Sequence, residues 1–228
     1  IFEIQIAENA TSHIFSITVE VEADIDITFG NEFIADAYIN PESIFIWDGG
    51  QNTDTTNHFS GAYIYNYLNE QGISCIYSTE VPMSLVGFDA VFLSFGNPGD
   101  MGNQDAPFLA KDARIIQDYL EHEGSLYLEG GRSLGYYQSY NTELLNLLGL
   151  EVVGYGGETF PLEIVGHENS VGENIVFNGN AQSPRINIDA YDPANTGTVT
   201  LTQTDFGHIA IQNEGEQGQK SIFSSCAL

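Results

Sequence analysis

The chain has 228 residues, of which 42% are hydrophobic, and it carries a formal net charge of −27 at pH 7. That hydrophobic fraction is large enough to bury a full core, which excludes disorder along the whole chain. The acidity disfavours binding to nucleic acid or to an anionic membrane, because like charges repel. We interpret it as a solvated surface, with adaptation to a cation-rich or extracellular medium and weak calcium binding as the alternatives.

No apolar run approaches the roughly 18 residues that cross a bilayer, so we expect no membrane insertion. The N-terminus carries neither the basic nor the hydrophobic part of a signal peptide, and it does not begin with Met. We therefore expect a processed or excised piece of a longer protein.

Apolar and polar residues alternate over residues 2–6 and again over residues 15–21. This period of two is typical of half-buried strands in an antiparallel sheet. Two or three strands cannot form a sandwich by themselves. Residues 1–41 are therefore predicted to be either the tail of a β-sandwich module or strands that dock on the main domain.

From Ser43 onward, continuous apolar runs alternate with helical patterns. Such runs favour central parallel strands that are covered on both faces. The order of strand and helix predicts a parallel sheet with right-handed crossovers. Strands are expected at residues 44–47, 73–78, 88–95 and 125–128, and helices at residues 58–71, 108–123 and 142–148. Residues 42–228 are thus predicted to form an α/β domain with a doubly wound, mostly parallel sheet flanked by helices.

The last part of the chain returns to short strand patterns separated by Gly, Asn and Pro. These strands are expected at residues 152–153, 175–177, 186–188 and 199–201. Residues 208–212 and 221–226 are predicted to form a terminal hairpin. Because no helical pattern follows, we expect a β-rich C-terminal part and a domain that is truncated at this end.

In open parallel sheets, ligands bind beyond the carboxyl ends of the strands, near the point where strand order reverses. Gly-rich segments occupy that edge at residues 48–50, 96–100 and 129–132. Glycine lets backbone amides approach a ligand, although tight turns alone also require it. The side chains predicted to bind a ligand are Asp48, Asn97, Asp100, Glu129, Arg132 and Tyr136.

No phosphate-binding spacing is complete in these loops, and no His, Cys and Asp cluster has the spacing of a zinc site. We therefore predict neither a cofactor nor a metal. Cys75 and Cys226 could form one disulfide or remain two buried thiols, and their apolar strand contexts favour thiols.

The order of strands and helices, together with the segment Ser125-Leu126-Tyr127-Leu128-Glu129-Gly130-Gly131, resembles the class I glutamine amidotransferase-like superfamily, whose domains are flavodoxin-like. In its catalytic members this strand ends in a turn that exposes a nucleophilic Cys. Here the elbow position falls on Glu129, with Gly130 beside it. The resemblance therefore implies a domain that lacks the thiol. His167 and His208 do not complete a Cys–His–acid arrangement.

A second resemblance covers residues 43–228, which are similar to domains of large secreted bacterial proteins that also contain β-sandwich repeats. It implies a secreted or cell-surface location and other modules of the same chain as partners. It implies no defined activity.

Our leading hypothesis is a non-catalytic extracellular interaction or structural module with a polysaccharide or protein ligand. The first alternative is a hydrolase in which Asp48 and Glu129, at neighbouring strand ends, divide the acid and base roles. Arg132 would then hold an anionic group, unless it pairs locally with Glu129 or Asp100. The second is carbohydrate binding by Tyr136, Tyr137 and Tyr140, of which at least two are expected to pack internally.

Overall fold

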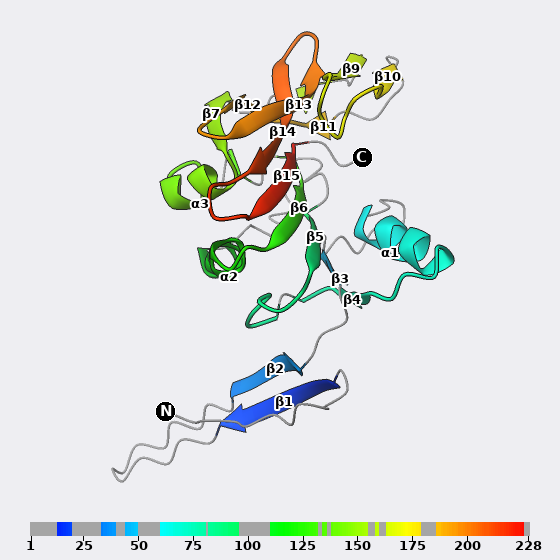
Figure 1. Ribbon diagram of the computed structural model, residues 1–228, viewed down its shortest axis with the longest axis vertical. Coiled ribbons are helices and arrows are strands. Elements are labelled where there is room, and N and C mark those ends of the chain that lie inside the picture. The colour runs from blue at the N-terminus through cyan, green and yellow to red at the C-terminus, as the bar shows by residue number, and fades with distance from the viewer. Residues whose placement is uncertain are drawn as a thin grey trace.

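A nine-stranded mixed sheet forms the centre of the computed structural model, which describes residues 13–19, 33–39, 44–49, 60–80, 82–95, 110–131, 134–135, 138–154, 158–159, 163–178 and 186–225. The strand order is β10-β9-β13-β14-β15-β6-β5-β3-β4. Helix α1 (Ser60–Glu70) lies on one side of this sheet, and α2 (Ala110–Glu121) and α3 (Thr142–Leu147) lie on the other (Figure 1). The predicted α/β fold class is confirmed.

One half of the sheet is parallel. Its strands are β4 (Ile76–Ser78), β3 (Ile44–Asp48), β5 (Ala90–Ser94), β6 (Ser125–Glu129) and β15 (Lys220–Ser224). In chain order these read 2-1-3-4-5, which is the flavodoxin-like arrangement, and strand order reverses between β3 and β5. The apolar runs predicted to be central strands are the middle of this half.

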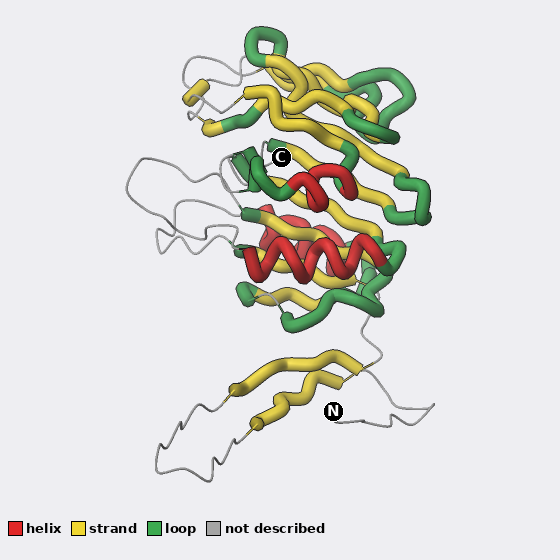
Figure 2. The backbone as a smooth tube through the Cα atoms, turned by 90° about the vertical axis from the view of Figure 1, so that its left-hand side faces the viewer, coloured by secondary structure: helices red, strands yellow, loops and turns green. Residues whose placement is uncertain are grey.

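The other half is antiparallel and extends the sheet beyond β15 (Figure 2). Its strands are β14 (Gly207–Glu214), β13 (Gly197–Gln203), β9 (Glu163–Gly166) and β10 (Val176–Asn178). The predicted terminal hairpin is confirmed as β14 and β15. The prediction missed that β15 also pairs with β6, in parallel, as the fifth strand of the other half. Local alternation predicts a turn but not a partner nearly a hundred residues away.

Small two-stranded sheets complete the described structure. β7 (Leu150–Gly154) pairs with β12 (Ala190–Pro193), and β8 (Glu158–Thr159) pairs with β11 (Ile186–Asn187). β1 (His13–Val19) and β2 (Phe33–Ile39) form an antiparallel pair, which confirms strand structure for the start of the predicted 15–21 segment. Residues 2–6 lie outside the described residues. No helix in the described ranges is long and apolar enough to span a membrane.

The main core lies between the parallel strands and helices α2 and α3. Alternate residues of each strand face it, as the period of a strand requires. The strand members are Phe45, Trp47, Val91, Leu93, Leu126, Leu128 and Phe223, and the helix members include Ile116, Leu120, Leu144 and Leu148. The residues between them face α1, and this second face carries the candidate site.

Cys75 is half-buried just before β4. Cys226 lies outside the described residues, so the state of the two thiols stays a prediction.

Candidate site at the carboxyl edge of the parallel strands

Four polar residues stand in one row where the parallel strands end. Asp48 pairs with Ser94, Ser94 pairs with Glu129, and Glu129 pairs with Ser224 across β3, β5, β6 and β15. Residues in register share a face of the sheet, so the four side chains point to the α1 side. All four are buried, with 2% of Asp48 and 1% of Glu129 exposed. The predicted carboxylates therefore do lie at this edge, but inside the protein.

Asp48 and Glu129 were expected on neighbouring strands, and this expectation is wrong. Strand β5 lies between β3 and β6, and Ser94 occupies the position between the two acids. Two strand spacings place the two backbones about 10 Å apart. The order of strands along the chain does not determine their order in the sheet. The sequence alone therefore could not show that β5 separates the two acids.

Each carboxylate accepts a hydrogen bond from a tyrosine of the preceding row. The hydroxyl of Tyr77 donates to Oδ2 of Asp48 at 2.9 Å, and that of Tyr127 donates to Oε2 of Glu129 at 2.7 Å. The pKa of Tyr77 is raised to about 12, first by burial and then by the hydrogen bond to Asp48 and the charge of Asp48. The two phenols hold the acids as buried acceptors. Sequence reasoning missed both tyrosines, although Tyr127 stands two residues before Glu129.

Helix α1 begins directly over the point where strand order reverses. The hydroxyls of Ser60 and Ser94 lie 2.9 Å apart, within hydrogen-bonding distance. A Cβ added to Gly61 would lie 2.9 Å from Cβ of Asp48, so the helix start packs against this acid. A helix N-terminus favours a negative charge. Asp48 supplies that charge from within the protein, and a phosphate-like ligand would have to compete with it.

In the turn after β6, the residue with the unusual backbone conformation is Gly130, which has no side chain. Gly130 has φ of 151°, a value that favours glycine, whereas Glu129 is the last residue of the strand. The amide of Gly130 donates to the carbonyl of Ser224 at 3.0 Å, and the amide of Phe95 donates to the carbonyl of Glu129 at 2.9 Å. The turn is thus fastened to both neighbouring strands. It exposes no nucleophile at Glu129 or Gly130.

A second buried polar cluster lies next to the end of β15. The amide of Asp189 donates to Oγ of Ser225 at 2.6 Å, and the hydroxyl of Tyr191 lies 3.3 Å from Oδ2 of Asp189. The amide of Gly135 donates to the same Tyr191 hydroxyl at 3.2 Å. Burial raises the pKa of Tyr191 well above its ordinary value, and the charge of Asp189 adds to the effect. This cluster holds residues 134–135, beyond the β6 turn, against β12, and no pattern in the sequence indicated it.

Most of the other residues singled out from the sequence are not among those that the structure describes. Asn97, Asp100, Arg132, Tyr136 and Tyr137 lie outside the described residues, so their predicted roles stay predictions. Tyr140 is described and 72% exposed.

The two downstream histidines lie in the antiparallel half of the sheet. Nε2 of His167 and Nδ1 of His208 both contact Oγ1 of Thr202, at 2.7 and 2.9 Å. Strand β6, which carries Glu129, pairs with β5 and β15, and neither of these strands carries one of the two histidines. Within the described part of the chain, no three His, Cys, Asp or Glu side chains are placed to hold a metal ion.

An open hollow of about 480 Å³ lies at the opposite, amino edge of the sheet. Its lining comes from the end of α2, from α3 and from the β14–β15 turn: Glu121, Glu143, Asn146, Leu147 and Gln217. None of these residues belongs to the row of strand-end polar residues.

No protein-family model and no curated protein sequence matches this chain. Solved structures that are similar include a β-galactosidase from Rahnella sp. R3, with 12% identity and a TM-score of 0.48 over 80% of this chain. A glutamine amidotransferase from Methylobacillus flagellatus has 12% identity and a TM-score of 0.48, over 83% of this chain and 70% of that one. A glutamine amidotransferase from Thermotoga maritima has 16% identity and a TM-score of 0.39, over 71% and 67%.

The class that the fold defines is a doubly wound α/β domain with a flavodoxin-like parallel half, and its structural neighbours include glutamine amidotransferases. The chain spans 28% of the length of the β-galactosidase. Likenesses at this level of identity and TM-score carry no argument about function, which has to come from the side chains.

Proposed function

We propose that this chain is a non-catalytic interaction or structural module of a larger secreted protein. The observation that carries the proposal is the turn after β6, where the residue with the unusual backbone conformation is Gly130. A nucleophile elbow works because its strained residue presents a reactive side chain to the substrate. Glycine presents none, so covalent acyl transfer has no attacking group at this turn.

The buried state of the two acids supports the same proposal. Acid and base catalysis requires a carboxyl group that can reach the proton it moves. Asp48 and Glu129 are almost fully buried and accept hydrogen bonds from Tyr77 and Tyr127. Burial of this kind favours a role in stabilising the edge of the sheet over contact with a substrate.

An extracellular setting agrees with the composition. A net charge of −27 keeps a protein soluble and repels nucleic acids and anionic lipids. We propose that the module acts outside the cell, beside other modules of the same chain, and that it binds a polysaccharide or a protein.

The rival function is a carboxylate-dependent hydrolase, and the observation in its favour is that Asp48 and Glu129 belong to one row with a single strand between them. A separation of roughly 6.5–9.5 Å between two carboxyl groups suits inverting glycoside hydrolysis. The rival requires the row to become open to water and substrate.

A substrate screen distinguishes the two functions. The purified chain and its Glu129→Gln and Asp48→Asn variants are assayed with chromogenic glycosides, esters and amides. We expect no turnover above the uncatalysed rate for the unsubstituted chain. Turnover that Glu129→Gln reduces a hundredfold or more, in a variant with an unchanged circular dichroism spectrum, would establish the hydrolase and remove the proposal.

The location is tested in the cells that make the protein. An antibody against this chain is used on culture medium, cell wall and cytoplasm, and intact cells are treated with protease. We expect a band larger than this chain outside the cytoplasm, sensitive to protease on intact cells. Recovery from the cytoplasm alone would contradict the extracellular proposal.

A further inference from the structure

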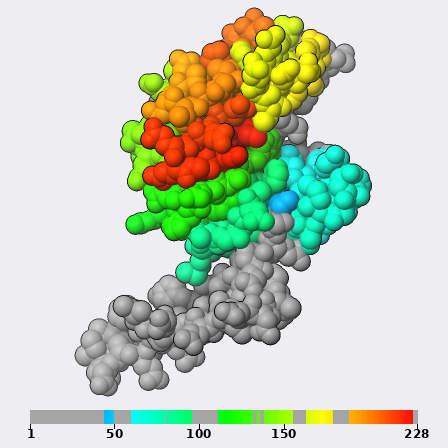
Figure 3. All heavy atoms as spheres, viewed as in Figure 1, coloured from blue at the N-terminus to red at the C-terminus, as the bar shows by residue number. Residues whose placement is uncertain are grey.

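Helix α1 projects from the sheet and buries little of its surface. Figure 1 and the space-filling view in Figure 3 show it as a protrusion beside the parallel half. Only Ser60 and Gly61, at its beginning, are buried. Tyr63 and Tyr67 are 58% and 63% exposed. Large exposed apolar surfaces of this kind mark interaction sites more often than they serve the fold.

Four of the five exposed side chains of α1 form one stripe. Tyr63, Asn66, Tyr67 and Glu70 follow the spacing i, i+3, i+4, i+7 and are all exposed. Residues with this spacing lie on one face of a helix, with Cβ atoms of the i, i+4 pair about 5–6 Å apart. Two tyrosine rings are thus presented side by side, at a spacing that two neighbouring rings of a sugar chain could meet.

The opposite side of α1 is fixed to the site described above. The rings of Tyr65 and Tyr77 lie 5.2 Å apart at an interplanar angle of 49°, a favourable aromatic arrangement. Tyr77 is in turn bonded to Asp48. The stripe is therefore held on a helix whose orientation is set by aromatic packing at one side and by Ser60 and Gly61 at its start, which reduces the ordering cost of binding.

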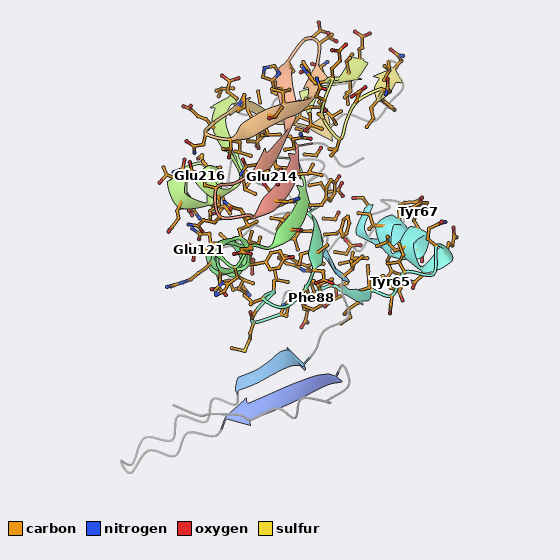
Figure 4. The ribbon with its side chains drawn as sticks, in the orientation of Figure 1. Tyr65, Tyr67, Phe88, Glu121, Glu214 and Glu216 are labelled. Carbon is orange, nitrogen blue, oxygen red and sulfur yellow. The ribbon has the colours of Figure 1, made fainter. Side chains whose placement is uncertain are left out.

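The rings and the amide of the stripe are uncharged, and its last residue, Glu70, is its one acid. Residues 60–69 contain no Asp, Glu, Lys or Arg, in a chain whose net charge is −27. The amide of Asn66, which lies on the same face as the two tyrosines, is exposed. In Figure 4 Tyr65 and Tyr67 lie on the side of the sheet away from the labelled acids Glu121, Glu214 and Glu216.

These features select among possible occupants. A cationic partner would be drawn to the acids on the other side of the sheet, and a second copy of the chain would meet a like charge of −27. An uncharged sugar chain fits both parts of the stripe, because its C–H faces stack on aromatic rings and its hydroxyls bond to amides. Tyrosine is suited to this role because one end of the ring is apolar and the other polar.

We propose that Tyr63 and Tyr67 form a binding platform for an uncharged polysaccharide, with Asn66 between them as a hydrogen-bonding group. The inference rests on the proposed function as a non-catalytic module and names the class of its ligand. The platform uses none of the three tyrosines that follow β6 in the sequence, Tyr136, Tyr137 and Tyr140.

Affinity electrophoresis tests the platform. The complete chain is run in native gels cast with barley β-glucan, glucomannan, galactan or hydroxyethylcellulose as uncharged probes, and with alginate as a charged one. We expect retardation by at least one uncharged polysaccharide and none by alginate. Substitution of both residues, Tyr63→Ala with Tyr67→Ala, is expected to weaken binding roughly tenfold or more, since each aromatic contact contributes favourably.

Matched variants keep the result interpretable. Tyr63→Phe with Tyr67→Phe retains the rings and is expected to bind within about threefold of the unsubstituted chain. Phe177→Ala removes an exposed aromatic ring elsewhere, on β10, and is expected to bind normally. Circular dichroism verifies that each variant is folded.

Three outcomes would overturn the platform. They are no retardation by any uncharged probe, retardation that the double Ala variant retains, and a concentration-dependent dimer of the free chain that this variant abolishes. The last outcome would show that a second copy occupies the stripe. Each leaves the non-catalytic proposal standing, because that proposal fails only in the substrate and localisation experiments.

Discussion

Tyr127 and Glu129 stand two residues apart on β6, so both side chains leave the same face of the sheet, and the tyrosine hydroxyl donates a 2.7 Å hydrogen bond to Oε2 of the acid. The residue at the predicted elbow position is thus directed back along its own strand. Its carboxylate accepts a bond from the protein where an exposed nucleophile or base would meet a substrate. We therefore expect Glu129 to contribute to the stability of the fold through this bond.

A double-mutant cycle measures that stabilisation. We expect Tyr127→Phe and Glu129→Gln each to lower the free energy of unfolding by about 1–3 kcal/mol, because each removes or weakens a bond to a buried carboxylate. Since the two side chains share one bond, the double variant should lose about 0.5–2 kcal/mol less than the sum. Urea denaturation gives all four values. A coupling energy of zero would mean that the bond contributes nothing to stability.

Alkaline unfolding should depend on Tyr119. Its hydroxyl lies 3.1 Å from the carbonyl of Phe88 and 3.2 Å from that of Ser125, and it accepts a bond from the amide of Ser125 at 3.1 Å. Burial raises its pKa to about 12, above the ordinary value of 10.0. A group whose pKa is raised by folding adds stability that is complete below the unfolded pKa and is lost as pH rises to the folded one.

The chain should therefore lose stability between pH 10 and 12 as the unfolded state releases the Tyr119 proton first. For Tyr119→Phe we expect a loss of about 1–3 kcal/mol at pH 7 from the missing bonds. We also expect a smaller decline from pH 10 to 12, by up to about 1.4 kcal/mol per pH unit. Tyr140→Phe, at an exposed tyrosine, is the control and should follow the unsubstituted chain. Equal slopes for Tyr119→Phe and the unsubstituted chain would contradict the interpretation.

The parts of the fold that sequence reasoning predicted correctly are those that local patterns determine. The apolar run at residues 44–47 is a central strand, because a strand buried on both faces has apolar residues at successive positions. The glycine-bounded pattern around α2 is a helix, because burial of one face repeats apolar residues at helical spacing. No local pattern predicts the parallel pairing of β15 with β6. It depends on a contact between segments far apart in sequence, which a single chain does not reveal.

In the candidate site, too, the features that depend on local sequence were predicted and those that depend on distant contacts were not. Asp48 and Glu129 were predicted at the carboxyl edge because each directly follows a buried strand. Their burial and their tyrosine donors were missed, since both follow from how neighbouring strands are ordered and aligned. The Asp189 cluster was missed for a further reason, because it joins the end of β15 to a loop that follows β6 and to β12.

The Asp189 cluster leads to a steric prediction at Gly135. A Cβ at this position would lie 2.2 Å from Oδ2 of Asp189, which is fully buried and has little room to move. We expect Gly135→Ala to destabilise the chain by about 2–4 kcal/mol, through displacement of Asp189 and its bonds.

Gly154→Ala is the matched control for this substitution, because among the described residues its Cβ would meet Ala190 Cβ at 3.5 Å, an ordinary contact. Its effect should stay within about 1 kcal/mol. Thermal unfolding of both variants tests the comparison. Similar melting temperatures for Gly135→Ala and the unsubstituted chain would show that Asp189 can move at little cost in stability. The cluster would then not hold the residues beyond the β6 turn in place.

Thr202 connects the two downstream histidines, and its removal should affect both at once. One hydroxyl has one proton, so Oγ1 of Thr202 can donate to only one of His167 and His208 while it accepts from the other. At most one of the two facing ring nitrogens can accept the hydroxyl proton, and a ring nitrogen that donates to this oxygen carries its own proton, so the two tautomers share one partner. We expect Thr202→Val to change the ring ¹⁵N chemical shifts of both histidines and to cost about 1–2 kcal/mol of stability. Thr204→Val, two residues further along, should leave both rings unchanged because its hydroxyl contacts Glu163. A change confined to one ring would mean that the two imidazoles are not coupled through this hydroxyl.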